Sequence, residues 1–215
     1  MGSGSALNVI VETGVIAIMR ASSSDRLLPA AEAILAGGVR AIEVAMTTPD
    51  ALDVIRQMAN WLADGVVVGV GTVLDGETAR AAILAGADFI VSPTFNPATI
   101  EVCKRYAVPV IPGAYTPNEI LAAWTAGASL VKVFPASAGG PAYIKAIHAP
   151  LPQVRLIAVG GVTVENAAEF VRAGVEAVAV GSELVNDELL AVGDFATIAE
   201  RARQFRAQVQ AGRGR

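Results

Sequence analysis

The sequence predicts a single-domain (β/α)₈ barrel, and three observations support this fold class. Eight short apolar runs recur along the chain, about 23 residues apart on average. Segments with helical patterns separate these runs, and several of the segments end at a glycine just before the next run. Buried strands that alternate with helices are typical of parallel βα units, and eight units on one small domain favour closure into a barrel. An open, doubly wound sheet is the second interpretation.

The predicted strands are nearly all-apolar, as expected of strands that are covered on both faces. Their ranges are 15–20, 41–46, 66–73, 89–92, 110–113, 130–135, 156–161 and 177–181. Between them, the predicted helices with a glycine stop are 28–36, 79–85, 119–126 and 167–173. Capping residues or a first-turn proline mark helix starts at 24–25, 48–50, 116–119 and 163–166.

Bulk composition excludes several classes of protein. The 215 residues are 53% hydrophobic and only 17% charged, so the chain can bury a large core. The net charge is −4 and no run of Lys and Arg occurs, which argues against nucleic acid or an anionic membrane surface as a partner. Mean hydropathy is high at +0.53. No segment approaches the roughly 20 apolar residues of a membrane span, so this apolarity indicates buried strands.

The ends of the chain and its rare residues add further expectations. Residues 1–5 are interpreted as a leader left by cloning, residues 6–210 as the barrel, and residues 211–215 as a flexible tail. No signal-peptide pattern is found, so a cytoplasmic protein is expected. The single cysteine, Cys103, excludes an intrachain disulfide and is expected to be a buried structural thiol. The single histidine, His148, is expected at the surface, which argues against a Ser–His triad or a histidine-ligated metal.

Lys132 is the most informative residue of the chain. Two of its three lysines, Lys104 and Lys145, lie in helical patterns where they can reach water, whereas Lys132 lies inside an apolar strand. Burial lowers the pKa of a lysine and frees its amine as a nucleophile toward carbonyl carbons. The alternative is a lysine on an edge strand that extends its ammonium group to solvent.

Glu43 and Arg20 are the other charged groups near strand ends. Glu43 lies within the second predicted strand, and alternate strands of a barrel share layers, so its carboxyl and the Lys132 amine can approach each other. Such a pair is either a structural ion pair or an acid/base carboxylate that serves an amine nucleophile. Arg20 ends the first predicted strand and favours the catalytic interpretation.

Glycine turns follow the last two predicted strands. Gly160 and Gly161 follow the seventh strand, and Gly181 and Ser182 follow the eighth. Barrels often bind phosphate in these two loops, where glycine lets backbone N–H groups approach an anion. The alternative is that the glycines only make tight turns between a strand and a helix.

Together these segments resemble the 2-keto-3-deoxy-6-phosphogluconate (KDPG) and 4-hydroxy-2-oxoglutarate (KHG) aldolase family, which includes the phosphogalactonate (KDPGal) enzymes. The resemblance runs from about Val15 to Val185, and its segments are AIMR (17–20), EVAMTTP (43–49), GVGTVLD (69–75), FIVSPTFNP (89–97), VIPGAYTPNE (110–119), VKVFPASAGGPAYIKA (131–146), AVGGVTVENAAEF (158–170) and VGSELV (180–185).

The resemblance implies a class I aldolase that uses a Schiff base and needs neither a metal nor another cofactor. Its substrate would be a phosphorylated 2-ketoacid, which is cleaved to pyruvate and glyceraldehyde 3-phosphate, and its assembly a homotrimer. Lys132 would form the Schiff base, Glu43 would be the general acid/base, and Arg20 would bind the substrate carboxylate or another part of the substrate in the active site. The remaining implied substrate contacts are Thr72, Pro93 and Phe134 around the pyruvyl group and Gly160, Gly161 and Ser182 around the phosphate.

Two departures from the family pattern concern the carboxyl end of the substrate. KDPG aldolases often carry arginine where this chain has Thr47, and Pro-Thr where it has Ala158-Val159. The sequence around the glycine pair is more similar to the phosphogalactonate branch. Two other functions stay open: a phosphate-binding barrel isomerase or synthase, and a trimeric scaffold engineered from an aldolase.

Overall fold

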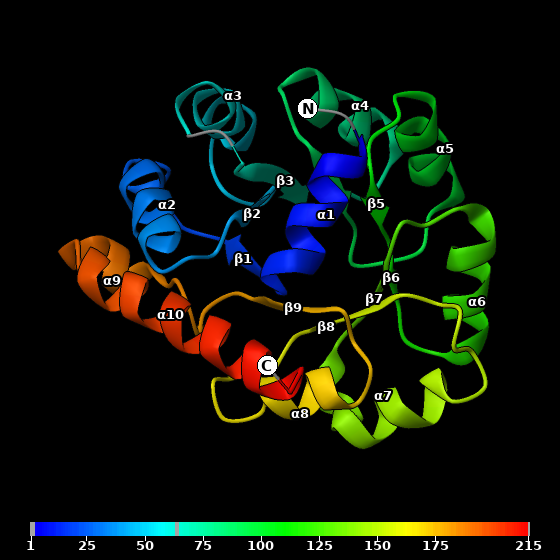
Figure 1. The fold of residues 1–215 in the computed structure, drawn as a ribbon. Helices are drawn as coiled ribbons and strands as arrows, with labels where there is room; N and C mark the ends of the chain where they lie inside the picture. The colour runs from blue at the N-terminus through cyan, green and yellow to red at the C-terminus, as the bar shows by residue number, and fades with distance from the viewer. Residues whose placement is uncertain (1–2, 63–64, 215) are drawn as a thin grey trace.

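The structure is a computed structural model that describes residues 3–62 and 65–214. A parallel barrel lies at its centre and helices surround it (Figure 1). The strands of the described chain are β1 Val15–Met19, β2 Ala41–Ala45, β3 Val67–Gly71, β4 Phe89–Val91, β5 Val110–Ile111, β6 Gly113–Ala114, β7 Val131–Val133, β8 Leu156–Val159 and β9 Ala177–Val180. Its helices are α1 Ser3–Thr13, α2 Leu27–Ala36, α3 Ala51–Trp61, α4 Gly76–Leu84, α5 Pro97–Arg105, α6 Pro117–Ala126, α7 Gly140–His148, α8 Ala167–Arg172, α9 Asp187–Val192 and α10 Phe195–Gly212, with a short 3₁₀ helix at Ala136–Ala138.

The fifth predicted strand closes the barrel as two short pieces, β5 and β6, on either side of Pro112. The order of the strands is β5-β4-β3-β2-β1-β9-β8-β7-β6, with β5 and β6 at the two ends. Backbone hydrogen bonds join this whole segment to the chain around β7, because the N–H of Ser129 donates to the Val110 carbonyl at 2.9 Å and the N–H of Lys132 to the Pro112 carbonyl at 2.9 Å. Proline has no N–H, so it interrupts the strand without opening the barrel. The prediction of a barrel is confirmed, and the open sheet is wrong.

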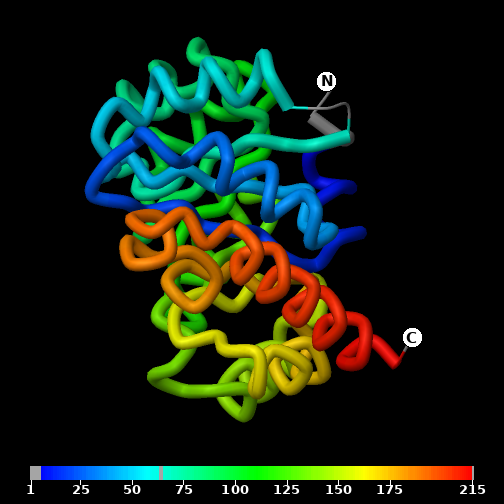
Figure 2. The backbone as a smooth tube through the Cα atoms, turned by 90° about the vertical axis from the view of Figure 1, so that its left-hand side faces the viewer, coloured from blue at the N-terminus to red at the C-terminus, as the bar shows by residue number. Residues whose placement is uncertain are grey.

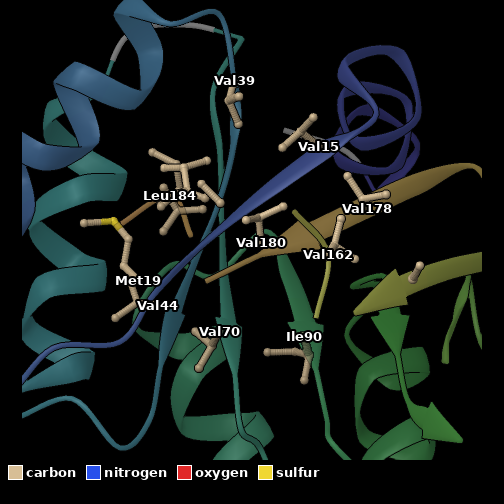
Figure 3. Packing of buried hydrophobic residues seen from close by; sticks show 14 of the residues in the cluster. Val15, Met19, Val39, Val44, Val70, Ile90, Val162, Val178, Val180 and Leu184 are labelled. Atoms are coloured by element: carbon tan, nitrogen blue, oxygen red, sulfur yellow. The ribbon is translucent and has the colours of Figure 1, made fainter. Parts of the chain in front are cut away.

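Two apolar layers surround the strands. The inner layer fills the barrel with side chains such as Ile16, Phe89 and Ile157, and α1 closes its N-terminal end with Val9 and Ile10. The outer layer packs between strands and helices. Figure 3 shows part of it, including Met19, Val44, Val70, Val178 and Val180 from neighbouring strands. The sequence did not predict α1, which begins at Ser3 within the segment interpreted as a leader. Residues 1–2 of that leader lie outside the described residues.

Helix boundaries follow the predicted glycine stops more closely than the predicted starts. The stops after α4, α6 and α8 are confirmed, since Gly86, Gly127 and Gly174 have φ values of 105°, 103° and 112° that favour glycine. Thr116 and Glu119 form a capping box at the start of α6, as predicted. The predicted cap at 24–25 is wrong, because α2 begins at Leu27 without a side-chain cap.

The rare residues mostly lie where the sequence places them. Cys103 is fully buried, and desolvation raises the pKa of its thiol to about 12, which fits a structural thiol. His148 is the last residue of α7 and is half-buried, so its predicted exposure is only partly correct. Among the described residues, no helix is both long and apolar enough to cross a bilayer.

The segment 211–215, interpreted as a flexible tail, begins inside a helix. Helix α10 continues to Gly212, and the next residue, Arg213, holds three backbone carbonyls. Its guanidinium group donates to Val11 at 2.6 Å, Glu12 at 3.1 Å and Glu176 at 2.7 Å. These contacts tie the end of the chain to α1 and to the start of β9. Figure 2 accordingly shows α1 and the last turns of α10 on the same side of the molecule.

We expect Arg213→Ala to lower the free energy of unfolding by about 1–3 kcal/mol, because three carbonyls lose a charged hydrogen-bond donor. Urea denaturation measures this change. Arg203→Ala is the matched control, since Arg203 lies exposed on the same helix and pairs only with Glu200 among the contacts shown, so its loss should cost less than about 0.5 kcal/mol. Equal losses in the two variants would contradict an anchoring role for Arg213.

Candidate active site

A cavity of about 450 Å³ opens at the C-terminal end of the strands. This is the end at which barrel enzymes carry their active sites. The structure brings all the site residues predicted from the sequence to the lining of this one cavity, from seven different strands or strand ends: Arg20, Glu43, Thr72, Pro93, Lys132, Phe134, Gly160, Gly161 and Ser182.

Lys132 lies in the middle of β7 and is only 6% exposed. Its Nζ lies 4.7 Å from the centre of the Phe134 ring. Desolvation is the main cause that lowers the pKa of Lys132; the positive charge of Arg20 lowers it further, and the charge of Glu43 opposes the shift. Lys104 and Lys145 are exposed on helices α5 and α7, as predicted. Lys132 is therefore the lysine of the three that is buried, and its lowered pKa favours the neutral amine.

Glu43 lies in β2 and is 2% exposed. Burial raises the pKa of its carboxyl group, while the charges of Lys132 and Arg20 act in the opposite direction. Within the part of the chain that the structure describes, Oε2 of Glu43 has no hydrogen-bond partner, and no ion pair joins Glu43 to Lys132. A closed structural ion pair is thus not what the geometry favours. The carboxyl group retains the capacity to exchange a proton in the cavity.

Arg20 and Thr72 form a contact at the rim of the cavity. Arg20 follows β1 and is exposed, and its Nη2 donates to Oγ1 of Thr72 at 3.3 Å. Thr72 follows β3 with a φ of 61°, in the left-handed region where a β-branched residue is strained. Such strain persists only where the surroundings impose it, and it is frequent at ligand sites. The pair places a guanidinium group in the same cavity as the Lys132 amine.

Left-handed glycines shape the other side of the cavity. Gly160 and Gly161 have φ values of 89° and 74°, and the N–H of Ser137 donates to the Gly160 carbonyl at 3.0 Å. A β-carbon at Gly161 would lie 2.8 Å from Oγ of Ser137, so this turn packs closely against the segment that follows β7. The helices that follow β8 and β9, α8 and α9, have six residues each. Any anion selectivity here would therefore depend on the loops themselves rather than on long helix dipoles.

About half of the residues that line the cavity were not predicted from the sequence. The missed residues include Val159 and Ala179, which point inward from β8 and β9, and Glu183, Asn186 and Asp187 beyond Ser182. Period-two alternation along the strands was the available signal for the inward residues. Thr47, one of the two departures from the family pattern, is exposed and does not line the cavity, whereas Val159 of the other departure does.

The described residues contain no group of three or more His, Cys, Asp or Glu side chains that could hold a metal ion. The polar groups that the cavity brings together include the Lys132 amine, the Glu43 carboxyl group and the Arg20 guanidinium group. This set can form a carbon–nitrogen bond, move a proton and bind a carboxylate.

Comparisons with known proteins agree with this geometry. The family model described as KDPG and KHG aldolase matches residues 7–201. The 2-dehydro-3-deoxy-phosphogluconate aldolase of Treponema pallidum is 37% identical, over 88% of this chain and 90% of its own. The 2-dehydro-3-deoxy-6-phosphogalactonate aldolase of Escherichia coli is also 37% identical, over 79% of this chain and 83% of its own.

One solved structure among the relatives holds a reaction intermediate. The KDPG aldolase of Legionella pneumophila, with pyruvate captured at low pH as a covalent carbinolamine, superposes with a TM-score of 0.85. It is 29% identical, and the match covers 92% of this chain and 96% of the other. Fold, cavity and sequence all lead to one conclusion: the chain belongs to the KDPG and KHG aldolase family.

Proposed function

We propose that the protein is a class I aldolase that cleaves a 2-keto-3-deoxy-6-phospho sugar acid, of the gluconate or galactonate series, to pyruvate and glyceraldehyde 3-phosphate. The observation that carries the proposal is the Lys132 amine, which is buried, has a lowered pKa and lines one cavity with the Glu43 carboxyl. The relatives named for phosphogluconate and phosphogalactonate substrates support this class of substrate.

The first half of the mechanism makes an electron sink. The free amine of Lys132 attacks the C2 carbonyl carbon of the substrate and forms a carbinolamine. Loss of water, with proton transfer by Glu43, gives an iminium ion whose positive charge can accept electrons from the neighbouring bond. The carbinolamine captured in the Legionella pneumophila relative supports this step.

The second half breaks the carbon–carbon bond. Glu43, directly or through a water, takes the proton of the C4 hydroxyl, and the C3–C4 electron pair moves toward the iminium nitrogen. Glyceraldehyde 3-phosphate leaves and an enamine of pyruvate remains on Lys132. Protonation of the enamine at C3 restores the iminium ion, and its hydrolysis releases pyruvate and the free amine.

The other residues of the cavity are proposed to position the substrate. Arg20 and Thr72 would bind its carboxylate, and Pro93 and Phe134 would surround the pyruvyl carbons. The loop residues Gly160, Gly161 and Ser182 would bind the phosphate, so that remote binding energy holds the reacting carbons in place.

Two alternatives make different demands on this cavity. A phosphate-binding isomerase or synthase needs the glycine loops but has no need of a buried amine in β7. A scaffold engineered from an aldolase would keep the fold, and its Lys132 need not react. Trapping the imine with a reductant distinguishes both from the aldolase.

We expect pyruvate and borohydride to inactivate the protein irreversibly and to label Lys132. The trapping rate should rise with pH, and the midpoint of this rise should lie below the ordinary lysine pKa of 10.5. Glu43→Gln should move this midpoint to lower pH, because the Glu43 charge raises the pKa of Lys132. Arg20→Met should move it to higher pH, because the Arg20 charge lowers that pKa. Peptide mass spectrometry and initial trapping rates measure both effects.

Lys145→Arg is the control for this experiment, since Lys145 is exposed and should contribute no label. Label on Lys104 or Lys145 in place of Lys132 would overturn the assigned nucleophile. A shift of the midpoint in the same direction for both charge variants would contradict the electrostatic account.

We expect Ser182→Ala to lower kcat/KM for the phosphorylated substrate by about tenfold, the effect of one lost hydrogen bond of roughly 1.4 kcal/mol to a charged group. Cleavage of an unphosphorylated 2-ketoacid should change by less than twofold. Ser182 is the better test of the phosphate loops, because a side chain at Gly161 would also displace Ser137. Equal losses on both substrates would indicate that the phosphate binds elsewhere.

We also propose a homotrimer, which light scattering at micromolar protein tests as a mass three times the 22.0 kDa of one chain. Exposed Leu84, Tyr106 and Leu121 support an apolar interface on the helices α4 to α6. Tyr115 does not, because it stacks on Tyr143 of the same chain, with ring centroids 4.9 Å apart. A mass near one chain would reject the trimer.

A further inference from the structure

Two inward positions of β3, Gly69 and Gly71, carry no side chain. Side chains of the two neighbouring strands occupy the space that is left. A β-carbon at Gly71 would lie 2.5 Å from Cδ and 2.9 Å from Cγ of Glu43, and nearer still to Oε1. A β-carbon at Gly69 would lie 2.5 Å from Cδ2 of Phe89. Real β-carbons essentially never approach so closely, so a side chain at either position requires its neighbour to move.

Backbone conformation does not explain these two glycines. Both lie within β3 and neither has a positive φ, so every residue type could adopt their conformation. Glycine in the interior of a strand is unfavourable, because it loses more backbone entropy than other residues and adds no packing. What the two positions provide is room inside the barrel.

The room at Gly71 determines where the Glu43 carboxyl lies. Glu43 is in register with Gly69, yet its carboxyl group lies over Gly71, two residues further along β3. At about 3.3 Å per residue, the side chain extends along the barrel axis toward its C-terminal end. That is the end where Lys132 and Arg20 line the cavity, and where their charges oppose the rise in the pKa of Glu43 that burial causes.

We propose that Gly71 is a positioning residue of the active site: the space left by its missing side chain holds the Glu43 carboxyl in the cavity, within reach of the reacting substrate. The proposal rests on the proposed function for the role of Glu43 and adds the residue that sets its position. A methyl group at residue 71 displaces the carboxyl group without removing it. The amine, the phosphate loops and the chemical groups of the site all remain.

The test compares Gly71→Ala with Gly69→Ala, a matched control. Each adds one methyl group to the same inner face of β3, within 2.5 Å of side-chain atoms of a neighbouring strand. Both should lower the melting temperature by several degrees, as added volume in a packed core does. Gly71→Ala should lower kcat by about 100-fold, which is the low end of the contribution of a general acid/base group. It should also shift the pH at which the pH–rate profile has its maximum. Gly69→Ala should change kcat by less than about fivefold and leave the profile in place.

Combining each glycine substitution with Glu43→Ala separates the effect on the position of the carboxyl group from a general loss of stability. Once Glu43 is shortened to alanine, a methyl group at residue 71 has nothing to displace, so Glu43→Ala/Gly71→Ala should match Glu43→Ala in both turnover and melting temperature. Gly69→Ala should instead lower the melting temperature equally with and without Glu43. If Gly71→Ala alone fails to fold, recovery of folding in the double variant gives the same evidence. If neither Gly71→Ala nor Glu43→Ala/Gly71→Ala folds, the proposal is overturned.

Two outcomes distinguish this proposal from the proposed function. Full turnover in Glu43→Ala or Lys132→Ala would reject the aldolase mechanism assigned to those residues. The second outcome concerns Gly71. If Glu43→Ala is inactive but Gly71→Ala has the same turnover and pH profile as Gly69→Ala, the mechanism stays intact and the positioning role of Gly71 is overturned.

Discussion

Desolvation at the C-terminal end of the barrel is the constraint on which the site depends. Lys132 and Glu43 lie in an apolar interior where either ion is unfavourable, so the pKa of the amine falls and that of the carboxyl group rises. Both shifts favour the neutral forms, a free amine that attacks carbonyl carbons and a protonated carboxyl group that can donate a proton. Arg20 adds to the effect on the amine, since a second cation in the cavity opposes a charged lysine.

Closure of the barrel makes this environment possible. The two pieces of the fifth strand bond to β4 on one side and to β7 on the other, so the described strands surround the interior and shield it from water. Helix α1 covers the opposite end with apolar side chains. The cavity is therefore the exposed end of an otherwise filled interior, and small residues of β3 supply the room in which a carboxyl group can lie there.

The sequence predicted the elements whose signals are local. Apolar runs and glycine stops were enough for the strands and for the ends of α4, α6 and α8, and a charged residue inside an apolar run identified Lys132 and Glu43. The break at Pro112 and the role of α1 depend on distant partners. Gly71 had no visible signal, because the reason for its missing side chain is an atom of Glu43 that lies on another strand.

Function and stability are divided between the two ends of the barrel. Unfavourable features gather at the C-terminal end, where Lys132 and Glu43 are buried and Thr72 has a φ of 61°. At the other end, Arg213 ties α10 to α1 and to the start of β9, and Val9 and Ile10 fill the interior. A strained and partly unpaired site can persist only if the rest of the fold over-determines it. The contacts at the N-terminal end of the barrel provide this additional stability. A substitution there therefore changes the stability of the whole barrel before it changes the chemistry.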